Sequence, residues 1–319
     1  MEEAYARYRA ATIRSRLMLE AASEMVGLED WESRQASISL RPQGGSDWGI
    51  TLFASDAPDS VAEVVEGRAQ IGIVNPSAVL SMAYRGVGPF AEPQPVRVIT
   101  VIHQFDQLGF AVSARTGLTT LREVASRRYP LRVSLRGQVD HSVHLVTNQV
   151  LAALDFDLDD IRAWGGVVRY DRELPNGPNR IGAAERGEID AIFDEAMPTF
   201  GNRALKAGMR FLGLDEEALH RLESMGLQRV AITKEEYPDL DRDVWTVDFS
   251  GWPVFCRTDL DDGVVTAFCA GLEARKERIP WFGVGTLPLD QMCRDTREGP
   301  LPVPLHPAAE RFWRGKGYL

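Results

Sequence analysis

Residues 55–75 read SDAPDSVAEVVEGRAQIGIVN, and this stretch decides the fold class. Asp59 or Ser60 can cap a helix that runs to Glu66, and Gly67 ends it. Residues 70–74 are apolar almost throughout, as expected of a strand that is buried on both faces. Helix and strand alternate in this way to the end of the chain. The pattern therefore predicts an α/β protein with parallel sheets.

The rest of the chain divides around this unit. Apolar residues at helical spacing predict an opening helix over residues 4–26, and strand-like runs follow at residues 37–40 and 50–54. A segment with several prolines, residues 88–95, precedes a strand pair at residues 96–102 and 108–114. A second α/β unit then begins. We expect residues 1–107 to form the first part of lobe 1, residues 108–205 lobe 2, and residues 206–319 the return part of lobe 1.

Length and charge limit the function. The 319 residues are too many for one simple core and fit two lobes. The formal net charge of −10 offers no attraction for nucleic acid or anionic lipid, so neither is an expected partner. No run of about eighteen apolar residues occurs, so no membrane insertion is expected.

Known chemical motifs are missing from the sequence. The three cysteines are widely spaced, which argues against a disulfide framework or a zinc site, and Cys256 and Cys269 fit small core positions. The sequence has no P-loop, nucleophile elbow, GxGxxG or HExxH motif. We therefore expect no metal and no cofactor.

Four segments in this order carry a family resemblance. They read GRAQIGIVN (67–75), GLTTLREV with LRVSLRG (117–137), RGEIDAIFDEAMP (186–198) and PLHPAAERFWRGKGYL (304–319). Together they resemble the TAXI-type solute-binding proteins of TRAP transporters and, more distantly, the NMT1-like group. The resemblance implies a type II periplasmic-binding-protein fold, in which two α/β lobes joined by crossover strands hold a ligand in the cleft between them. It also implies a ligand of the carboxylate or amino-acid kind.

The chain departs from that family at its start. The family has a signal peptide, then a first strand and a Gly-rich loop before its first helix, whereas this sequence opens on the helix. Residues 42–48 are the expected replacement for the missing loop. A periplasmic location is expected if the sequence is a processed form, and a cytoplasmic one otherwise.

The candidate ligand contacts of the first lobe follow its strands. Ser55 and Asp56 occupy the place of the family's ligand-contacting Ser loop, although the segment can also serve only to cap a helix through Asp59 or Ser60. Asn75 ends a strand, where its amide can contact ligand or simply shape a turn before proline. Loops that leave parallel strands gather at one sheet edge, which would bring these residues together.

Further candidates lie on the crossover and in the second lobe. Gln104 and Asp106 either face the cleft or belong to an exposed hairpin loop. Arg136, Gln138 and His141 join a strand to a long helix, where Arg136 or His141 can pair with a ligand carboxylate, unless Asp140 caps the helix and Arg136 is solvated. Asp194 and Glu195 can bind an amine, a hydroxyl or a metal, act as acid and base, or serve as hinge or capping acids. The predicted ligand-binding set is Ser55, Asp56, Asn75, Gln104, Asp106, Arg136, Gln138, His141, Asp194 and Glu195.

The function expected from this set is solute binding without catalysis. The two lobes would close on a small polar or carboxylate ligand, with TRAP membrane subunits as partners. A cytosolic enzyme of the decarboxylase kind, using Arg136, His141, Asp194 and Glu195, is an alternative, because a fold alone does not fix function. A cytosolic metabolite sensor is a third reading.

Overall fold

The computed structural model describes residues 17–18, 21–22, 25, 35–41, 49–55, 57–102, 104–278 and 302–319. The chain forms two compact units, Met1–Arg34 and Gln35–Leu319, and every element named below belongs to the second. Most of the predicted helix at residues 4–26 lies outside the described residues, as do the 42–48 loop, Asp56 and Cys293. Residues 17, 18, 21, 22 and 25 of that segment are helical.

The first lobe is built on a five-stranded sheet with the order β1-β2-β3-β12-β4. The strands are β1 (Gln35–Leu40), β2 (Ile50–Ser55), β3 (Ile71–Ile73), β4 (Val96–Ile102) and β12 (Trp252–Arg257). β2 and β3 are parallel, whereas β1 and β12 run antiparallel to their neighbours. The sheet is therefore mixed, which corrects the prediction of parallel sheets.

Helices cover both faces of this sheet. α2 (Ser60–Val65) and α3 (Ser77–Arg85) pack on one face against residues such as Val98 and Phe255. α10 (Asp262–Arg275), followed by a short 3-10 turn (Lys276–Arg278), and α11 (Pro307–Gly315) cover the other. Cys256 and Cys269 lie in this second layer and are fully buried, which confirms them as core residues.

The second lobe repeats the plan with a sheet of order β7-β6-β8-β5-β9. Its strands are β5 (Gly109–Ser113), β6 (Arg132–Arg136), β7 (Val167–Asp171), β8 (Ala191–Asp194) and β9 (Met209–Phe211). β6 is parallel to β7 and β8, and β5 runs antiparallel between β8 and β9. The order β6-β8-β5-β9 thus matches β2-β3-β12-β4 of the first lobe, strand for strand and direction for direction.

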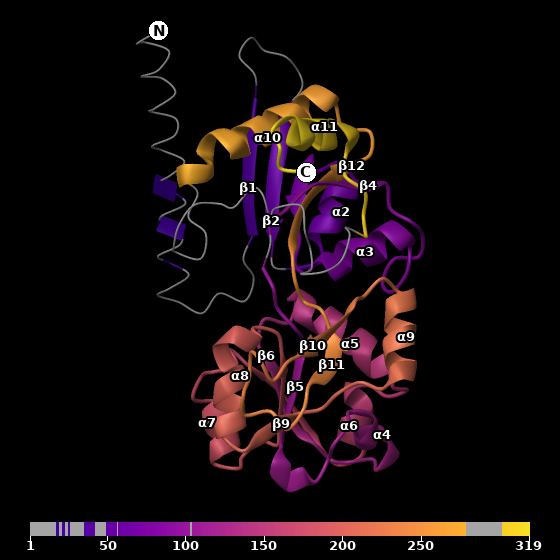
Figure 1. Ribbon diagram of the computed structural model, residues 1–319, viewed down its shortest axis with the longest axis vertical. Coiled ribbons are helices and arrows are strands. Elements are labelled where there is room, and N and C mark those ends of the chain that lie inside the picture. Colours follow the sequence, from indigo (N-terminus) through magenta and orange to yellow (C-terminus); the bar gives the residue numbers. More distant parts are fainter. Residues whose placement is uncertain are drawn as a thin grey trace. The chain divides into compact units, whose positions relative to one another are not determined.

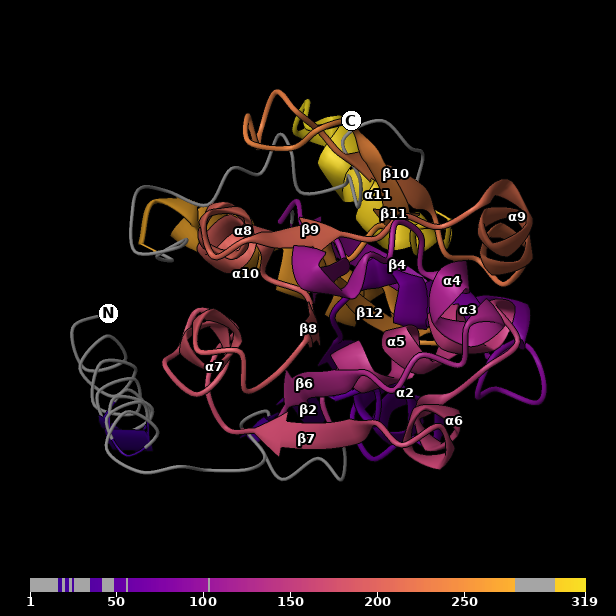
Figure 2. The ribbon, with the colours of Figure 1, turned by 90° about the horizontal axis from the view of Figure 1, so that it is seen from below.

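The helices of the second lobe form two layers, which lie on opposite sides of the sheet (Figure 2). Successive strand residues point alternately into one layer and into the other. One layer holds α4 (Arg122–Ser126), α5 (Ser142–Ala153), α6 (Leu158–Ala163) and α9 (Glu216–Ser224). The other holds α7 (Ile181–Glu185) and α8 (Met197–Lys206). A 3-10 turn (Ala114–Thr116) and a two-stranded sheet of β10 (Arg229–Ile232) and β11 (Val244–Val247) complete the lobe.

The chain crosses between the lobes twice, as Figure 1 shows: from β4 to β5 and from β11 back to β12. The two crossings are hydrogen-bonded to each other, because Phe249 N donates to Asp106 O (3.0 Å) and Gly251 N donates to Gln104 O (2.9 Å). β4 and β5 therefore belong to different sheets and do not form a hairpin. The return begins near residue 248, so the predicted boundary at residue 206 is too early: β9 pairs with β5 in the second sheet.

Candidate functional site

The first crossing connects corresponding edges of the two sheets. β2, β3 and β4 run in one direction and end at one edge of the first sheet, and β6, β8 and β9 likewise end at the corresponding edge of the second, with β12 and β5 running against them. The first crossing leaves the end of β4 and enters the start of β5. It therefore joins the two edges at which α/β folds generally place their ligands.

A buried ionic cluster occupies this edge of the second lobe. Arg136, the last residue of β6, donates from Nη2 to Asp194 Oδ1 (2.7 Å) and forms an ion pair with Glu195. Arg180 is fully buried and pairs with the other oxygen of Asp194. Arg180 Nε also donates to the hydroxyl of Ser134 (3.0 Å), which lies two residues before Arg136 on β6. Asp194 is thus held between two guanidinium groups with no exposure to solvent.

Asp106 links this cluster to the crossing. Its Oδ1 accepts from Gln107 N (2.8 Å) and Met197 N (3.0 Å), and its Oδ2 accepts from Ala196 N (2.9 Å) at the start of α8. The carboxyl groups of Asp106 and Glu195 share a hydrogen bond. Asp106 is buried, so it is not part of an exposed hairpin loop.

The electrostatics of the cluster follow from burial and pairing. Burial and the neighbouring Glu195 raise the pKa of Asp106 well above its usual range, and burial also raises the pKa of Glu195. For Asp194 the effect of burial is outweighed by Arg136 and Arg180, which lower its pKa. Two carboxyl groups in hydrogen-bond contact retain one proton between them. The two arginines of the cluster thus face three carboxyl groups, and each guanidinium group has a carboxylate partner.

His141 stands at the start of α5 and caps it. Its Nδ1 accepts from Val143 N (3.1 Å), and its Nε2 lies 3.0 Å from Arg136 Nη1. The predicted capping by Asp140 is thus replaced by His141, and Arg136 is half-enclosed by its partners instead of being solvated. Arg136 Nε is buried and has no hydrogen-bond partner among the described residues.

The first lobe contributes uncharged groups. Ser55 Oγ accepts from Ala57 N (3.0 Å) in the turn before α2, and Asp59 makes no side-chain cap to that helix. Asn75 Nδ2 donates to Gly251 O (3.3 Å), which ties the end of β3 to the return crossing. Ser77 begins α3, and its backbone N–H donates to Ser250 O (3.1 Å).

Four buried polar atoms at these edges have no partner within the described part of the chain: Ser77 Oγ, Gln104 Oε1, Arg136 Nε and Gln138 Nε2. Two come from the first lobe or its crossing, and two from the end of β6 in the second lobe. A buried polar atom without a partner costs about 1–3 kcal/mol. The four atoms thus come from the strand-end edges of both lobes.

Several participants escaped the sequence prediction. Arg180 comes after a proline-bearing break, and Ser77 and Ser250 lie beside prolines or glycines, where a turn is the default interpretation. The proline-bearing break before the short helix α7 is the one sequence signal that could have pointed to a functional residue near position 180. Of the predicted residues, Asp106, Arg136, His141, Asp194 and Glu195 do come together, Gln104 and Asn75 lie along the crossings, and Asp56 is outside the described residues.

Within the described residues, no group of three or more His, Cys, Asp or Glu side chains is placed to hold a metal ion. No helix in that part of the chain is long and apolar enough to cross a membrane. Unpaired hydroxyl and amide groups can take a ligand's donors and acceptors, and the neighbouring charges are already neutralised by one another.

Comparisons with solved structures find similar folds at low identity. One is the glycine/betaine/L-proline-binding protein ProX from Borrelia burgdorferi, at 12% identity and a TM-score of 0.37, with 65% of this chain and 64% of that chain covered. Another is a TctC solute-binding protein from Polaromonas, at 13% identity and a TM-score of 0.37, with 67% of each chain covered. A third is the ATP phosphoribosyl transferase complex from Thermotoga maritima, at 14% identity and a TM-score of 0.32, with 76% of this chain and 84% of that chain covered.

The family comparison is more extensive. No curated protein sequence matches the chain closely enough to count as a relative. The model of the NMT1-like family, however, matches residues 49–317. That range begins just before β2 and runs through the C-terminal α11, so it contains all the strands of the two lobes except β1. The chain therefore belongs to the NMT1-like family.

Proposed function

We propose that the protein is a solute-binding protein whose two lobes close on a small polar molecule at the crossing. The observation that carries this proposal is the set of four unpartnered buried atoms, Ser77 Oγ, Gln104 Oε1, Arg136 Nε and Gln138 Nε2. They come from both lobes and sit at the strand ends that the two crossings join. A ligand that satisfied groups from both lobes would bind the closed arrangement better than an open one, which is the condition for ligand-driven closure.

The chemistry of these atoms constrains the ligand. Gln104 Oε1 needs a donor, Arg136 Nε and Gln138 Nε2 need acceptors, and Ser77 Oγ can act as either. Because the ionic cluster is internally balanced, it offers one guanidinium N–H to a ligand but no uncompensated positive charge. A small polar solute fits this pattern, and a carboxylate oxygen would fit as the acceptor for Arg136 and Gln138.

TRAP membrane subunits are the partners that we propose for the closed form. The support is the resemblance of the segments at residues 67–75, 186–198 and 304–319 to TAXI-type proteins. In the terminal segment, His306 Nδ1 accepts from Ala308 N (3.2 Å) and caps α11, which explains a histidine before the proline that opens the helix. Ligand-dependent binding to vesicles that hold such subunits, absent without ligand, would be the direct test of partnership.

A thermal-shift screen against small carboxylates, amino acids and neutral polar solutes tests the binding function. A ligand at 100 times its Kd should add about 2.7 kcal/mol of stability. That gain corresponds to a rise in Tm of several degrees, at roughly 2–4 °C per kcal/mol for a protein of this class. No shift from any member of such a broad panel would count against solute binding.

The same ligand decides between binding and catalysis. The Asp106–Glu195 pair, with its raised pKa values, is the feature that favours an enzyme as second candidate, because perturbed carboxyl groups gather at catalytic sites. A ligand that is recovered unchanged after long incubation with the protein supports the binding function. A ligand that is consumed supports the enzyme.

A further inference from the structure

A second pocket lies at the opposite edge of the second lobe. It has a volume of about 510 Å³, within the range typical of small-molecule sites. Ala114, directly after β5, and Gly208, directly before β9, are among its lining residues. Because β5 pairs Gly109 with Asp194 at one end and Ser113 with Met209 at the other, this pocket is at the far end of the strands from the ionic cluster.

Two arginines line this pocket without carboxylate partners. Most arginines of the described chain are ion-paired, as are Arg122, Arg132 and Arg229 in the same lobe. Arg210 on β9 and Arg242 before β11 form no ion pair among the described residues, although Asp239 and Asp241 line the same pocket. Arg210 Nε is, in addition, buried without a hydrogen-bond partner. Opposite charges that share a pocket without closing on each other leave room for a ligand that pairs with both.

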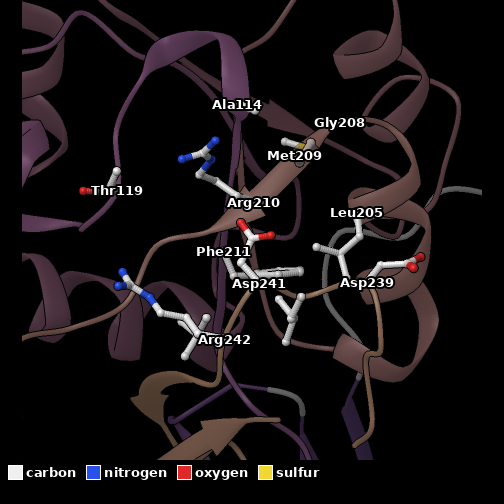
Figure 3. Close-up of a pocket in the computed structure, with 12 residues that line it drawn as sticks. Ala114, Thr119, Leu205, Gly208, Met209, Arg210, Phe211, Asp239, Asp241 and Arg242 are labelled. Carbon is white, nitrogen blue, oxygen red and sulfur yellow. The ribbon is translucent and has the colours of Figure 1, made fainter. Parts of the chain in front are cut away.

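Charged side chains of both signs line the pocket. In the view of Figure 3 the guanidinium groups of Arg210 and Arg242 lie on the same side of the pocket as Thr119, and the carboxylate of Asp239 lies on the opposite side with Leu205, with the carboxylate of Asp241 between them. Leu205 belongs to the last turn of α8, whose C-terminal carbonyls carry partial negative charge. One side thus favours an anionic group and the other a cationic one.

Apolar side chains also line the pocket: Leu205, Met209, Phe211, Leu240 and Val244. A bare inorganic ion would leave these side chains uncovered, whereas a short hydrocarbon segment between two charged ends would cover them. We propose that this pocket is a second binding site, separate from the interlobe site, and that it takes a small zwitterion with its anionic end at Arg210 and Arg242 and its cationic end at Asp239.

The test uses matched compounds on the full-length chain. Glycine, β-alanine and γ-aminobutyrate are zwitterions of increasing length. Acetate, propionate and butyrate retain only the anionic end, and methylamine, ethylamine and propylamine only the cationic end. Binding is followed by amide chemical shifts of the isotope-labelled protein, which also locate the site. At least one zwitterion should bind more tightly than both of its matched compounds and shift the amides of β9.

Variants at the two sides assign the contacts. Arg242→Gln should weaken the zwitterion and its alkanoate about ten-fold or more, the size of a charge-assisted hydrogen bond, and leave the alkylamine unchanged. Asp239→Asn should weaken the zwitterion and the alkylamine and leave the alkanoate unchanged. Both residues are exposed, so these variants should fold. Lys206→Gln removes an exposed cation of the same region that does not line the pocket, and it should change none of the affinities.

Four outcomes would overturn the proposal. The first is an alkanoate that binds as tightly as its zwitterion, and the second is a loss of zwitterion affinity in Lys206→Gln equal to that in Arg242→Gln. The third is a set of amide chemical-shift changes that is confined to the strand ends at the crossing and disappears in Ser77→Ala. The fourth is the absence of any shift of the β9 amides with every zwitterion.

Discussion

The two lobes have the same strand order but opposite ways of presenting polar groups at the crossing. The first lobe ends its strands in uncharged side chains: Ser55 and Asn75 each form one side-chain hydrogen bond, and Gln104 Oε1 is buried without a partner in the described part of the chain. The second ends its strands in Arg136 and Asp194, whose charges are matched within the lobe. The second lobe therefore presents charged groups that are already paired with one another, whereas the first lobe presents uncharged groups that can form hydrogen bonds with a ligand.

The outer edges of the sheets differ as well. In the second lobe β7 lies parallel to β6 and is reached through helices α5 and α6, whereas in the first lobe β1 pairs antiparallel with β2. At this edge an antiparallel strand next in sequence takes the place of a parallel strand that is reached through helices. The four strands that carry the site residues are unaffected, so the site is retained although the edge is rebuilt.

The largest expected effect on stability comes from breaking the buried ionic cluster of the second lobe. Asp194→Ala leaves Arg136 and Arg180 without their shared carboxylate in a buried place, and the free energy of unfolding should fall by about 3–5 kcal/mol. Urea denaturation measures it. Asp159→Ala, which breaks the exposed pair with Arg162 in the same lobe, is the control and should cause little change. Equal effects of the two variants would show that the buried cluster does not stabilise the lobe.

The next effect concerns the pH dependence of stability and Asp106, which links the ionic cluster of the second lobe to the first crossing. The raised pKa of Asp106 means that its stabilising contribution is complete below its unfolded value, near 3.8, and is lost as pH rises through the folded value. The lowered pKa of Asp194 acts the other way, so its contribution is lost as pH falls below the same value. Asp106→Asn should therefore gain stability relative to the wild type as pH rises above about 4. Urea melts across this range check it, and a constant difference would contradict the protonated pair.

A smaller effect separates two equivalent helix caps. His306 caps α11 of the first lobe and His141 caps α5 of the second, each through Nδ1. Loss of a cap costs about 1 kcal/mol. His141→Ala should cost more than His306→Ala, because His141 also contacts Arg136. Thermal denaturation of both variants gives the comparison, and the reverse order would place His141 outside the cluster.

The smallest effect on stability is expected in the first lobe. Ser77→Ala removes a buried hydroxyl that has no partner, so the free energy of unfolding should stay within about 0.5 kcal/mol of the wild type or rise. A loss above that size would mean that the hydroxyl already has a structural role. The solute affinity should fall in the same variant.

Local patterns predicted much of this architecture. Strands at 37–40, 50–54 and 70–74, the helix stop at Gly67 and the polar residues at strand ends all follow from side-chain periodicity and turn chemistry. The lobe boundary was misplaced because the pairing of β9 with β5 is a long-range contact that no local pattern reveals. Arg180 was missed because its partners, Ser134 and Asp194, become neighbours only through the pairing of β6 with β8. The mixed character of the sheets likewise depends on long-range pairing.

The most direct test of a solute held between the lobes compares Gln104→Met with Gln138→Met, two nearly isosteric changes on opposite sides of the crossing. The affinity of the solute found by the thermal-shift screen is measured by titration calorimetry for the wild type, both single variants and the double variant. Each single change should weaken binding by about 1 kcal/mol or more, which is roughly five-fold, because each removes a hydrogen bond to the same ligand. A solute whose affinity is unchanged by either variant would contradict a site shared by the two lobes.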